Sequence, residues 1–432
     1  MLLRVYTILT LLFFHLPLLA TEQDEQYEET LNPISYNNAE QNSTAIDEVT
    51  TLQDIKAATV ESPEKQVDAT KIWEPFVLLN TMIPINSSTT VKWYSGHLPG
   101  GFEMATPVII IHGKEPGPTV CLTAAVHGDE VNGVEIARRI MRNLTASELN
   151  GTVISVPVVN IDGLWRKDRY MSDRRDLNRA FPGNPSGSTA SRVAYSLFNN
   201  IIRHCDSVID LHSGSMYREN ITQLRADLTI PTVAEVAKQF GAISVLQSIA
   251  PSGSLRGAAT SIGIPAVVME VGGPFTLDIK LVETGVKALR SYLSSIDMLP
   301  SSFFWSAPQP IFYASSWIRS EHGGILISQV KLGEKVNKGE LLGSISNPIN
   351  EHVETLYAPF DGVVLGRAQD QFVSAGYAVF NLGERRDFEE LEQQGEQIKK
   401  DSAEKTAKQM GIVNLPNKSD NTDNDNKNNE KE

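Results

Sequence analysis

Apolar segments alternate with segments of helical periodicity between about residues 119 and 296, and this alternation constrains the fold more than any other feature. The apolar segments are hydrophobic throughout, which is typical of strands buried on both faces; they are 119–126, 152–159, 207–211 and 265–270. Helical spacing is found at 130–143, 189–203, 231–240 and 277–296. The sequence therefore predicts an α/β domain whose mostly parallel or mixed sheet is flanked by helices.

The pattern changes at about residue 306 to short strands separated by glycine and proline. The predicted strands are 324–330, 340–345, 355–358, 362–365 and 377–382. This pattern predicts a small all-β domain over 306–384, which follows a larger α/β domain over 71–305.

Both ends of the chain differ in composition from these two domains. Residues 1–20 combine one positive charge with an apolar run and a small residue before an acidic segment, which is typical of a secretory signal peptide. We therefore expect an exported protein, periplasmic or secreted, with no stable membrane insertion after signal cleavage. Residues 21–70 are acidic and poor in large apolar groups, and residues 385–432 form a polar tail. Both are expected to be disordered, apart from a marginal exposed helix over 386–410.

The net charge of −14 comes mainly from these ends. Residues 21–60 contain nine acids and one lysine, and residues 384–432 contain thirteen acids and nine bases. An acidic chain lacks the basic footprint of a nucleic-acid-binding protein, so we expect no nucleic-acid partner. Two cysteines exclude a fold built on many disulfides. Cys121 and Cys205 lie in or beside predicted buried strands and are expected to be two buried thiols rather than a bridge.

Three side chains that can bind a metal or carry a proton lie where three predicted strands stop. His127 follows the first strand, His212 follows 207–211, and Glu270 ends 265–270. Catalytic residues gather at the carboxyl ends of parallel strands, so these side chains are expected to meet. His127 and Glu130, three residues apart in a turn, can converge on one metal ion with His212. Three protein ligands and an open fourth position are typical of catalytic zinc.

Two further features fit a hydrolytic site. Residues 169–183 contain four arginines, among them Arg169, Arg175 and Arg179, with Asn178 beside the last. An arginine fork pairs with a carboxylate and asparagine adds neutral hydrogen bonds, so this loop predicts a carboxylate-bearing substrate. Glu270, after three apolar residues, is expected to act as general base and later as proton donor.

Four motifs resemble the succinylglutamate desuccinylase/aspartoacylase family, a branch of the zinc-carboxypeptidase-like fold. They occur in the order HGDE at 127–130, DLNRAFPG at 176–183, DLH at 210–212 and EVGG at 270–273. The resemblance implies one zinc ion per chain, Glu270 as general base, and ligands and substrate contacts at His127, Glu130, His212, Asn178 and Arg179. It also implies an arginine that polarises the scissile carbonyl; Arg169 matches, and a spacing two residues longer than in the best-known members leaves Arg175 as a substitute.

The second domain more loosely resembles a biotinyl/lipoyl-type barrel sandwich. The two halves correspond to 330–343 and 358–362. The hairpin at 347–352 lacks the lysine that such carriers modify. We therefore expect this domain to cover or rim the active site instead of carrying a cofactor.

The sequence thus predicts a zinc-dependent hydrolase that cleaves an amide bond of a small N-acyl amino acid or related carboxylate-bearing substrate, with Glu270 assisting the attack of a zinc-bound water. One alternative is a metallocarboxypeptidase acting on short or cell-wall peptides. Another is a non-catalytic binding protein on the same fold. The oligomeric state stays open.

Overall fold

The computed structural model describes residues 73–97, 103–215, 217–241, 243–300 and 311–409. All of them belong to one compact unit, which begins at Thr70. The predicted signal peptide, the acidic segment 21–70 and the end of the chain beyond Gln409 lie outside the described residues. No helix in the described part of the chain is long and apolar enough to span a membrane.

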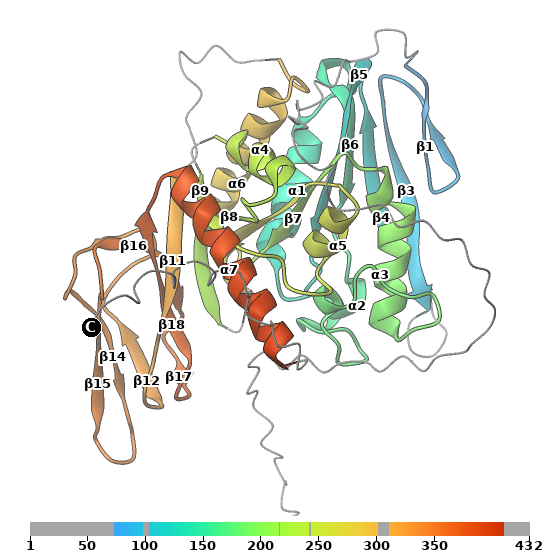
Figure 1. Cartoon of the computed structure of the whole chain (residues 1–432). Coiled ribbons are helices and arrows are strands. Elements are labelled where there is room, and N and C mark those ends of the chain that lie inside the picture. Colours follow the sequence, from blue (N-terminus) through green and yellow to red (C-terminus); the bar gives the residue numbers. More distant parts are fainter. Residues whose placement is uncertain (1–72, 98–102, 216, 242, 301–310, 410–432) are drawn as a thin grey trace, which may run out of the picture. The chain divides into compact units, whose positions relative to one another are not determined.

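Four parallel strands form the centre of the main sheet, and the sequence predicted all four. Their order is β10-β7-β5-β6, with every pairing parallel. Their bounds are β5 (Glu115–Ala124), β6 (Asn150–Val156), β7 (Ser207–His212) and β10 (Ala266–Gly272). Most of their residues are buried because helices cover both faces of the sheet (Figure 1). This arrangement confirms the predicted α/β fold.

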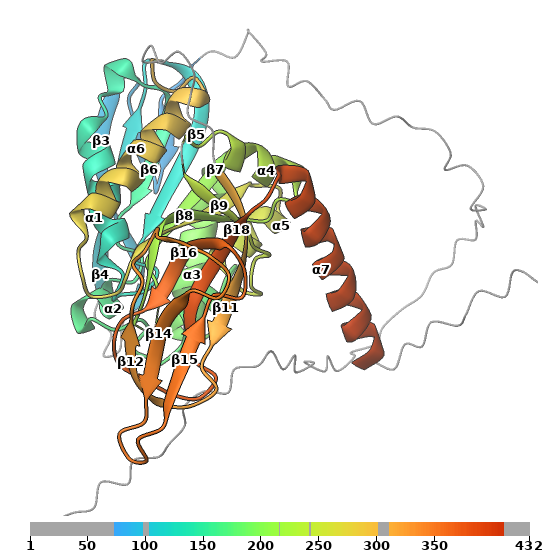
Figure 2. The ribbon, with the colours of Figure 1, turned by 90° about the vertical axis from the view of Figure 1, so that its left-hand side faces the viewer.

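The helices divide into two groups that cover opposite faces. One hydrophobic core contains the apolar sides of α1 (Val131–Asn143), α4 (Pro231–Lys238) and α6 (Ile279–Ser295). The other core contains those of α3 (Thr189–Asn200) and α5 (Leu255–Ser261). Figure 2 shows α1 and α6 alongside each other, and these two helices contact directly. A short helix, α2 (Ile161–Arg166), follows β6.

Antiparallel strands extend the parallel centre in both directions. β4 (Glu103–His112) pairs with β6, and β3 (Ser87–His97) pairs with β4. On the opposite side β8 (Arg218–Ala226) pairs with β10, and β9 (Ser244–Gln247) runs parallel to β8. We did not predict these four strands, because β3 and β8 carry many polar residues and β9 is only four residues long. A small hairpin of β1 (Phe76–Leu78) and β2 (Thr81–Ile83) precedes them.

The C-terminal β-rich region continues this sheet instead of standing apart from it. β11 (Ile311–Arg319) pairs with β9, and β16 (Gly362–Ala368) pairs with β8. The full order is β13-β16-β18-β11-β9-β8-β10-β7-β5-β6-β4-β3, with β13 at Lys335–Val336 and β18 at Ala378–Arg385. A second sheet has the order β15-β14-β12-β17, formed by Val353–Tyr357, Leu341–Ser346, Gly324–Ser328 and Phe372–Val373. The predicted boundary at 305/306 falls outside the described residues and stays a prediction.

The segment after β18 forms α7 (Phe388–Gln409), as its charge pattern indicated. The helix predicted over 386–410 is therefore confirmed. Two apolar residues anchor its first turn. Leu391 is fully buried, and the Phe388 ring lies 5.5 Å from the ring of Phe312 and 3.7 Å from Lys238 Nζ.

Cys121 and Cys205 form a disulfide, so the expectation of two free thiols was wrong. The parallel pairing of β5 with β7 brings the chain just before β7 beside β5. The two Cα atoms are 5.8 Å apart, within the range that a disulfide spans. The Asp206 N–H donates to the Thr119 backbone oxygen and the Thr119 N–H donates to the Asp206 carboxylate, which holds the same two segments together. Sequence spacing could not show this proximity.

The disulfide should stabilise the fold considerably, because it closes a long loop. The two cysteines are separated by 84 residues, for which loop-closure entropy gives about 4.5 kcal/mol. We expect the double variant Cys121→Ala/Cys205→Ala to lose several kcal/mol of unfolding free energy in urea denaturation. Wild type in reductant should unfold at a similarly lowered midpoint. Two reactive thiols in denatured, unreduced wild-type protein would contradict the assignment.

Candidate functional site

Three side chains that the sequence predicted as metal ligands converge at the carboxyl edge of the sheet. His127 and Glu130 come from the turn between β5 and α1, and His212 is the last residue of β7. Two glycines allow the approach. A Cβ on Gly128 would lie 1.9 Å from the backbone of Gly163, and one on Gly133 would lie 2.7 Å from the backbone oxygen of Leu211. The turn can therefore press against α2, and α1 can pack against β7.

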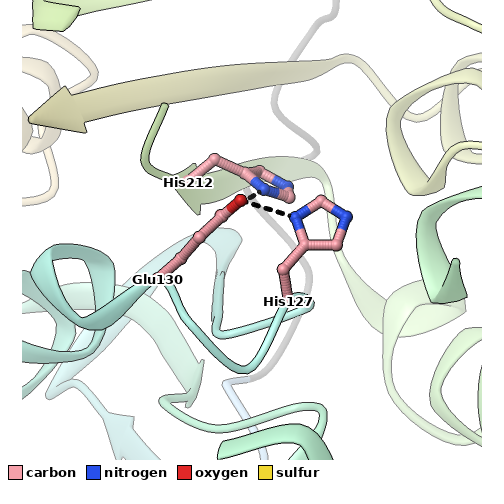
Figure 3. A group of neighbouring side chains, drawn as sticks. All are labelled: His127, Glu130 and His212. Carbon is pink, nitrogen blue, oxygen red and sulfur yellow. Dashed lines mark hydrogen bonds and ion pairs between the residues drawn. The ribbon is translucent and has the colours of Figure 1, made fainter. Parts of the chain in front are cut away.

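The carboxylate of Glu130 lies between the two imidazoles (Figure 3). Its Oε1 is 2.7 Å from His127 Nδ1, and its Oε2 is 2.8 Å from His212 Nδ1. Each of the three offers a ligand atom within 4.8 Å of the others, and all three are buried. Glu130 occupies the N-cap position of α1 but makes no capping hydrogen bond. Its carboxylate faces the histidines instead, where one metal ion could bind.

A second carboxylate holds each histidine from the far side of its ring. Asp176 Oδ1 lies 3.1 Å from His127 Nε2, and Asp210 Oδ2 lies 2.7 Å from His212 Nε2. Thr123 donates to the other oxygen of Asp210. Such partners place the proton on Nε2 and leave the Nδ1 lone pair free for a metal. The donor set therefore fits a metal ion. We had not assigned these roles, although both aspartates stand inside recognised motifs.

Mutual attraction stabilises the charged forms of this cluster. Burial raises the pKa of Glu130, but the two neighbouring histidines lower it by more, so it lies below its usual range. Burial lowers the pKa of His212, but Asp210 and Glu130 raise it well above the ordinary value. A metal ion must displace protons from these rings, so metal binding should weaken as the pH falls.

Glu270 lies beside this cluster because of strand register. It is paired with His212 across β10 and β7. Both of its oxygens face β8: Oε1 lies 3.3 Å from Arg225 Nε without hydrogen-bond alignment, and Oε2 accepts a hydrogen bond of 3.4 Å from Asn220 Nδ2. On the other side of β8, Gly366 of β16 is paired with Asn220.

The structure separates the two arginines that sequence analysis left as alternatives. Arg169 lies against the cluster, with one terminal nitrogen 3.1 Å from His127 Nδ1 and 3.3 Å from Glu130 Oε1, and the other 3.0 Å from an oxygen of Asp176. The side chain of Arg175 is 63% exposed, and its nearest acidic partner is Asp173 at 3.8 Å. Arg175 does not line the cavity described below.

Asn178 and Arg179 belong to a short helical turn, Leu177–Arg179, that adjoins the start of α5. The side-chain oxygen of Asn178 accepts from the Leu255 N–H at the start of α5, and its Nδ2 lies 3.5 Å from His212 Nε2. Arg179 donates to the backbone oxygen of Asn178. The Phe181 N–H donates to the oxygen of Gly253, which ties this loop to the segment before α5. The arginine-rich segment is thus held against the start of α5 and forms part of the wall of the site.

The three candidate metal ligands, Glu270, Arg169 and the Asn178–Arg179 pair line one cavity of about 270 Å³. This is slightly below the range typical of drug-sized ligands, so the cavity suits a molecule of amino-acid size. Its charged walls comprise two glutamates and five arginines, namely Glu130, Glu270, Arg169, Arg179, Arg218, Arg225 and Arg256. Trp317 of β11 also lines it, so the C-terminal region contributes to its wall. Sequence analysis missed the last three arginines, which carry no motif of their own.

Removing the support of one histidine should weaken metal binding without removing a ligand. We expect Asp210→Asn to lower the affinity for zinc, used as titrant, roughly 10- to 100-fold in competition with a chromogenic chelator. Asp206→Asn is the control, because Asp206 holds the Thr119 N–H away from the cluster. Unchanged affinity in a folded Asp210→Asn protein would show that His212 does not bind the metal.

Comparison with known proteins agrees with this geometry. The family model of the succinylglutamate desuccinylase/aspartoacylase catalytic domain matches residues 116–296. The N-alpha-acetyl-L-2,4-diaminobutyric acid deacetylase of Halomonas elongata is 26% identical over 292 residues, which cover 64% of this chain and 85% of the relative.

Solved structures share the fold at lower identity. The succinylglutamate desuccinylase/aspartoacylase from Rhodobacter sphaeroides superposes with a TM-score of 0.61 at 23% identity, covering 69% of this chain and 96% of that one. The product-bound ectoine utilization protein EutE (DoeB) from Ruegeria pomeroyi gives 0.61 at 23%, covering 70% and 97%. Residues 116–296, which contain the metal cluster, Glu270 and the Asn178–Arg179 pair, thus match the catalytic domain of the succinylglutamate desuccinylase/aspartoacylase family.

Proposed function

We propose that this protein is a zinc-dependent deacylase that hydrolyses the amide bond of a small N-acyl amino acid or a related carboxylate-bearing amide. One observation carries the proposal: the His127–Glu130–His212 cluster, Glu270 and several arginines face a single small cavity. The name of the Halomonas relative, a deacetylase of an N-acetylated amino acid, supports the substrate class.

Zinc is the metal that this donor set favours. Two imidazole nitrogens and one carboxylate match a common catalytic zinc set, and the absence of a fourth protein ligand among the described residues leaves a position for water or substrate. When bound there, zinc would supply Lewis acidity to the scissile carbonyl and make water more acidic.

Side chains of the protein carry out proton transfer, charge stabilisation and substrate binding. Glu270 takes the proton from the attacking water and returns it to the leaving nitrogen, because it is the carboxylate beside the cluster that is not needed as a ligand. The Arg169 guanidinium lies against the cluster and stabilises negative charge on the carbonyl oxygen. Arg179 binds the substrate carboxylate from the cavity wall, with the Asn178 backbone oxygen fixing its position.

Cavity size distinguishes this reaction from that of a peptidase with similar chemistry. A volume of about 270 Å³ with Trp317 in its wall favours a small amide over an extended peptide. A carboxypeptidase would need room for further residues on the acyl side of the bond. A purely binding role would not require a carboxylate placed beside the cluster in addition to three metal ligands.

Glu270→Gln separates catalysis from metal binding. We expect kcat for an N-acyl amino acid to fall by roughly 10²- to 10⁴-fold, because the amide cannot accept the proton. Zinc content by elemental analysis should stay at one ion per chain. Glu235→Gln on the exposed side of α4 should leave both quantities unchanged. Loss of zinc with Glu270→Gln would instead assign Glu270 to the metal.

We further propose that the protein is exported to the periplasm or secreted. The composition of residues 1–20 supports export. The Cys121–Cys205 disulfide also supports it, since such bonds persist mainly in oxidising compartments.

Export predicts a processed chain outside the cytoplasm. Expression of the full chain in a bacterial host should yield periplasmic protein whose intact mass corresponds to a first residue near Thr21. A variant in which Leu11 and Leu12 are replaced by Arg should remain cytoplasmic and unprocessed, because the apolar run is broken. Cytoplasmic wild-type protein that retains Met1 would contradict the proposal.

A further inference from the structure

Five strands close into a ring beside the catalytic cavity (Figure 2). β8 pairs with β9, β9 with β11, β11 with β18, β18 with β16, and β16 pairs with β8. Leu246, Tyr313 and Leu365 come from three of these strands and pack together as a small core, so they lie inside the ring. Asn220 of β8 and Trp317 of β11 line the cavity. The ring therefore joins the C-terminal region to the site.

Asn381 of β18 points into this ring. Its neighbours Phe380 and Leu382 belong to the hydrophobic core that β18 shares with the second sheet, and side chains alternate between the two faces of a strand. A Cβ on Gly383, two residues further on, would lie 2.2 Å from Leu365 inside the ring. Asn381 is completely buried, and neither its Nδ2 nor its Oδ1 has a hydrogen-bond partner among the described residues.

Asn220 connects this ring to the proposed general base. Its Nδ2 donates to Glu270 Oε2 at 3.4 Å, whereas its Oδ1 is buried and has no partner in the described part of the chain. The Oδ1 lies over Gly366, 2.5 Å from the point where a Cβ would stand, and the Cβ of Asn381 lies 3.5 Å from the same point. Gly366 is paired with Asn220 in one neighbouring strand and with Asn381 in the other. The two asparagines therefore approach each other across Gly366.

A water molecule between the two asparagines would satisfy both of them. Buried amide groups without hydrogen bonds are costly, and in proteins ordered water usually supplies the missing partner where polar groups converge. Such a water accepts from Asn381 Nδ2 and donates to Asn220 Oδ1. The donated hydrogen bond selects the amide orientation in which Asn220 turns its Nδ2 toward Glu270. The reversed amide would place its oxygen against the carboxylate.

We infer that Asn381 is a positioning residue for Glu270, acting through one ordered water and Asn220. This inference rests on the proposed deacylase function, in which Glu270 transfers the proton. Asn381 does not line the cavity, so it contributes by orienting the carboxylate toward the attacking water and not by contacting the substrate. The C-terminal region thereby takes part in proton transfer as well as forming a wall of the cavity.

Asn381→Leu tests the inference in zinc-loaded, full-length mature protein, because leucine has nearly the shape of asparagine but no donor. The substrate is the best hydrolysed of N-acetyl-L-alanine, N-acetyl-L-aspartate and N-acetyl-L-2,4-diaminobutyrate. We expect kcat to fall roughly 10-fold through misorientation of the base, while KM, zinc content and melting temperature stay unchanged. Asn381→Ser keeps a donor and room for water, so it should recover most of the lost kcat. A purely structural role predicts unchanged kcat in Asn381→Leu, since an apolar isostere of an unpaired buried amide is neutral or stabilising.

Further variants distinguish the water bridge from a general effect of substitutions in the protein interior. Asn220→Leu removes the hydrogen bond to Glu270 and should lower kcat at least as much. The double variant Asn220→Leu/Asn381→Leu should be no slower than Asn220→Leu, because the two residues act as a unit; additive losses would overturn the inference. Thr106→Val is the matched control and should leave kcat unchanged. Thr106 is also fully buried with no partner for its hydroxyl among the described residues, but it lies in β4, across the parallel centre from the ring.

A high-resolution crystal structure keeps this inference separate from the proposed function. In wild-type protein we expect a water within hydrogen-bond distance of both Asn220 Oδ1 and Asn381 Nδ2. In Asn381→Leu, Asn220 Nδ2 and Glu270 Oε2 should move beyond about 3.5 Å, too far for a hydrogen bond. Both results support the inference even if no N-acyl amino acid is hydrolysed, an outcome that would refute the deacylase proposal alone. Wild-type crystals without this water, or folded Asn381→Leu protein with unchanged kcat, would overturn the inference.

Discussion

The parallel register of β7 with its two neighbours is the constraint on which the site depends. Pairing with β10 places His212 directly beside Glu270, and pairing with β5 starts the turn that carries His127 and Glu130 at the same edge. Side chains of a strand alternate between faces, so a shift of one residue in either pairing would turn one member of the site away from the others. The dense apolar packing of these strands therefore also fixes the positions of the side chains that form the site.

The net charge of the chain and the net charge of the cavity walls have opposite signs. The chain as a whole is acidic, whereas the cavity walls hold five arginines and two glutamates. Asp176 and Asp210 are bound to the far sides of the two histidines, and Asp176 also pairs with Arg169. The negative charge inside the site is thus used to orient the metal ligands, and the remaining cations face the space where a substrate would lie.

The parallel centre and the residues at its strand ends were predictable, because hydrophobic periodicity and motif spacing are local properties. The grouping of Arg218, Arg225 and Arg256 was not, since their convergence depends on strands and a helix that meet only in the folded chain. The pairing of Cys121 with Cys205 escaped prediction for the same reason. The continuation of the main sheet into the C-terminal region was also not predictable. Polar, half-exposed strands such as β8 lack the uninterrupted apolar residues of the four central strands.

The pairing of Gly366 with Asn220 has an evolutionary consequence. A Cβ at position 366 would lie 2.5 Å from the side-chain oxygen of Asn220, whose amide nitrogen donates to Glu270. A single added methyl group in the C-terminal region would therefore disturb the carboxylate at the centre of the site. Selection should restrict this position as strictly as the site itself, although it never touches a substrate. The two regions should consequently have diverged together, as one inherited unit.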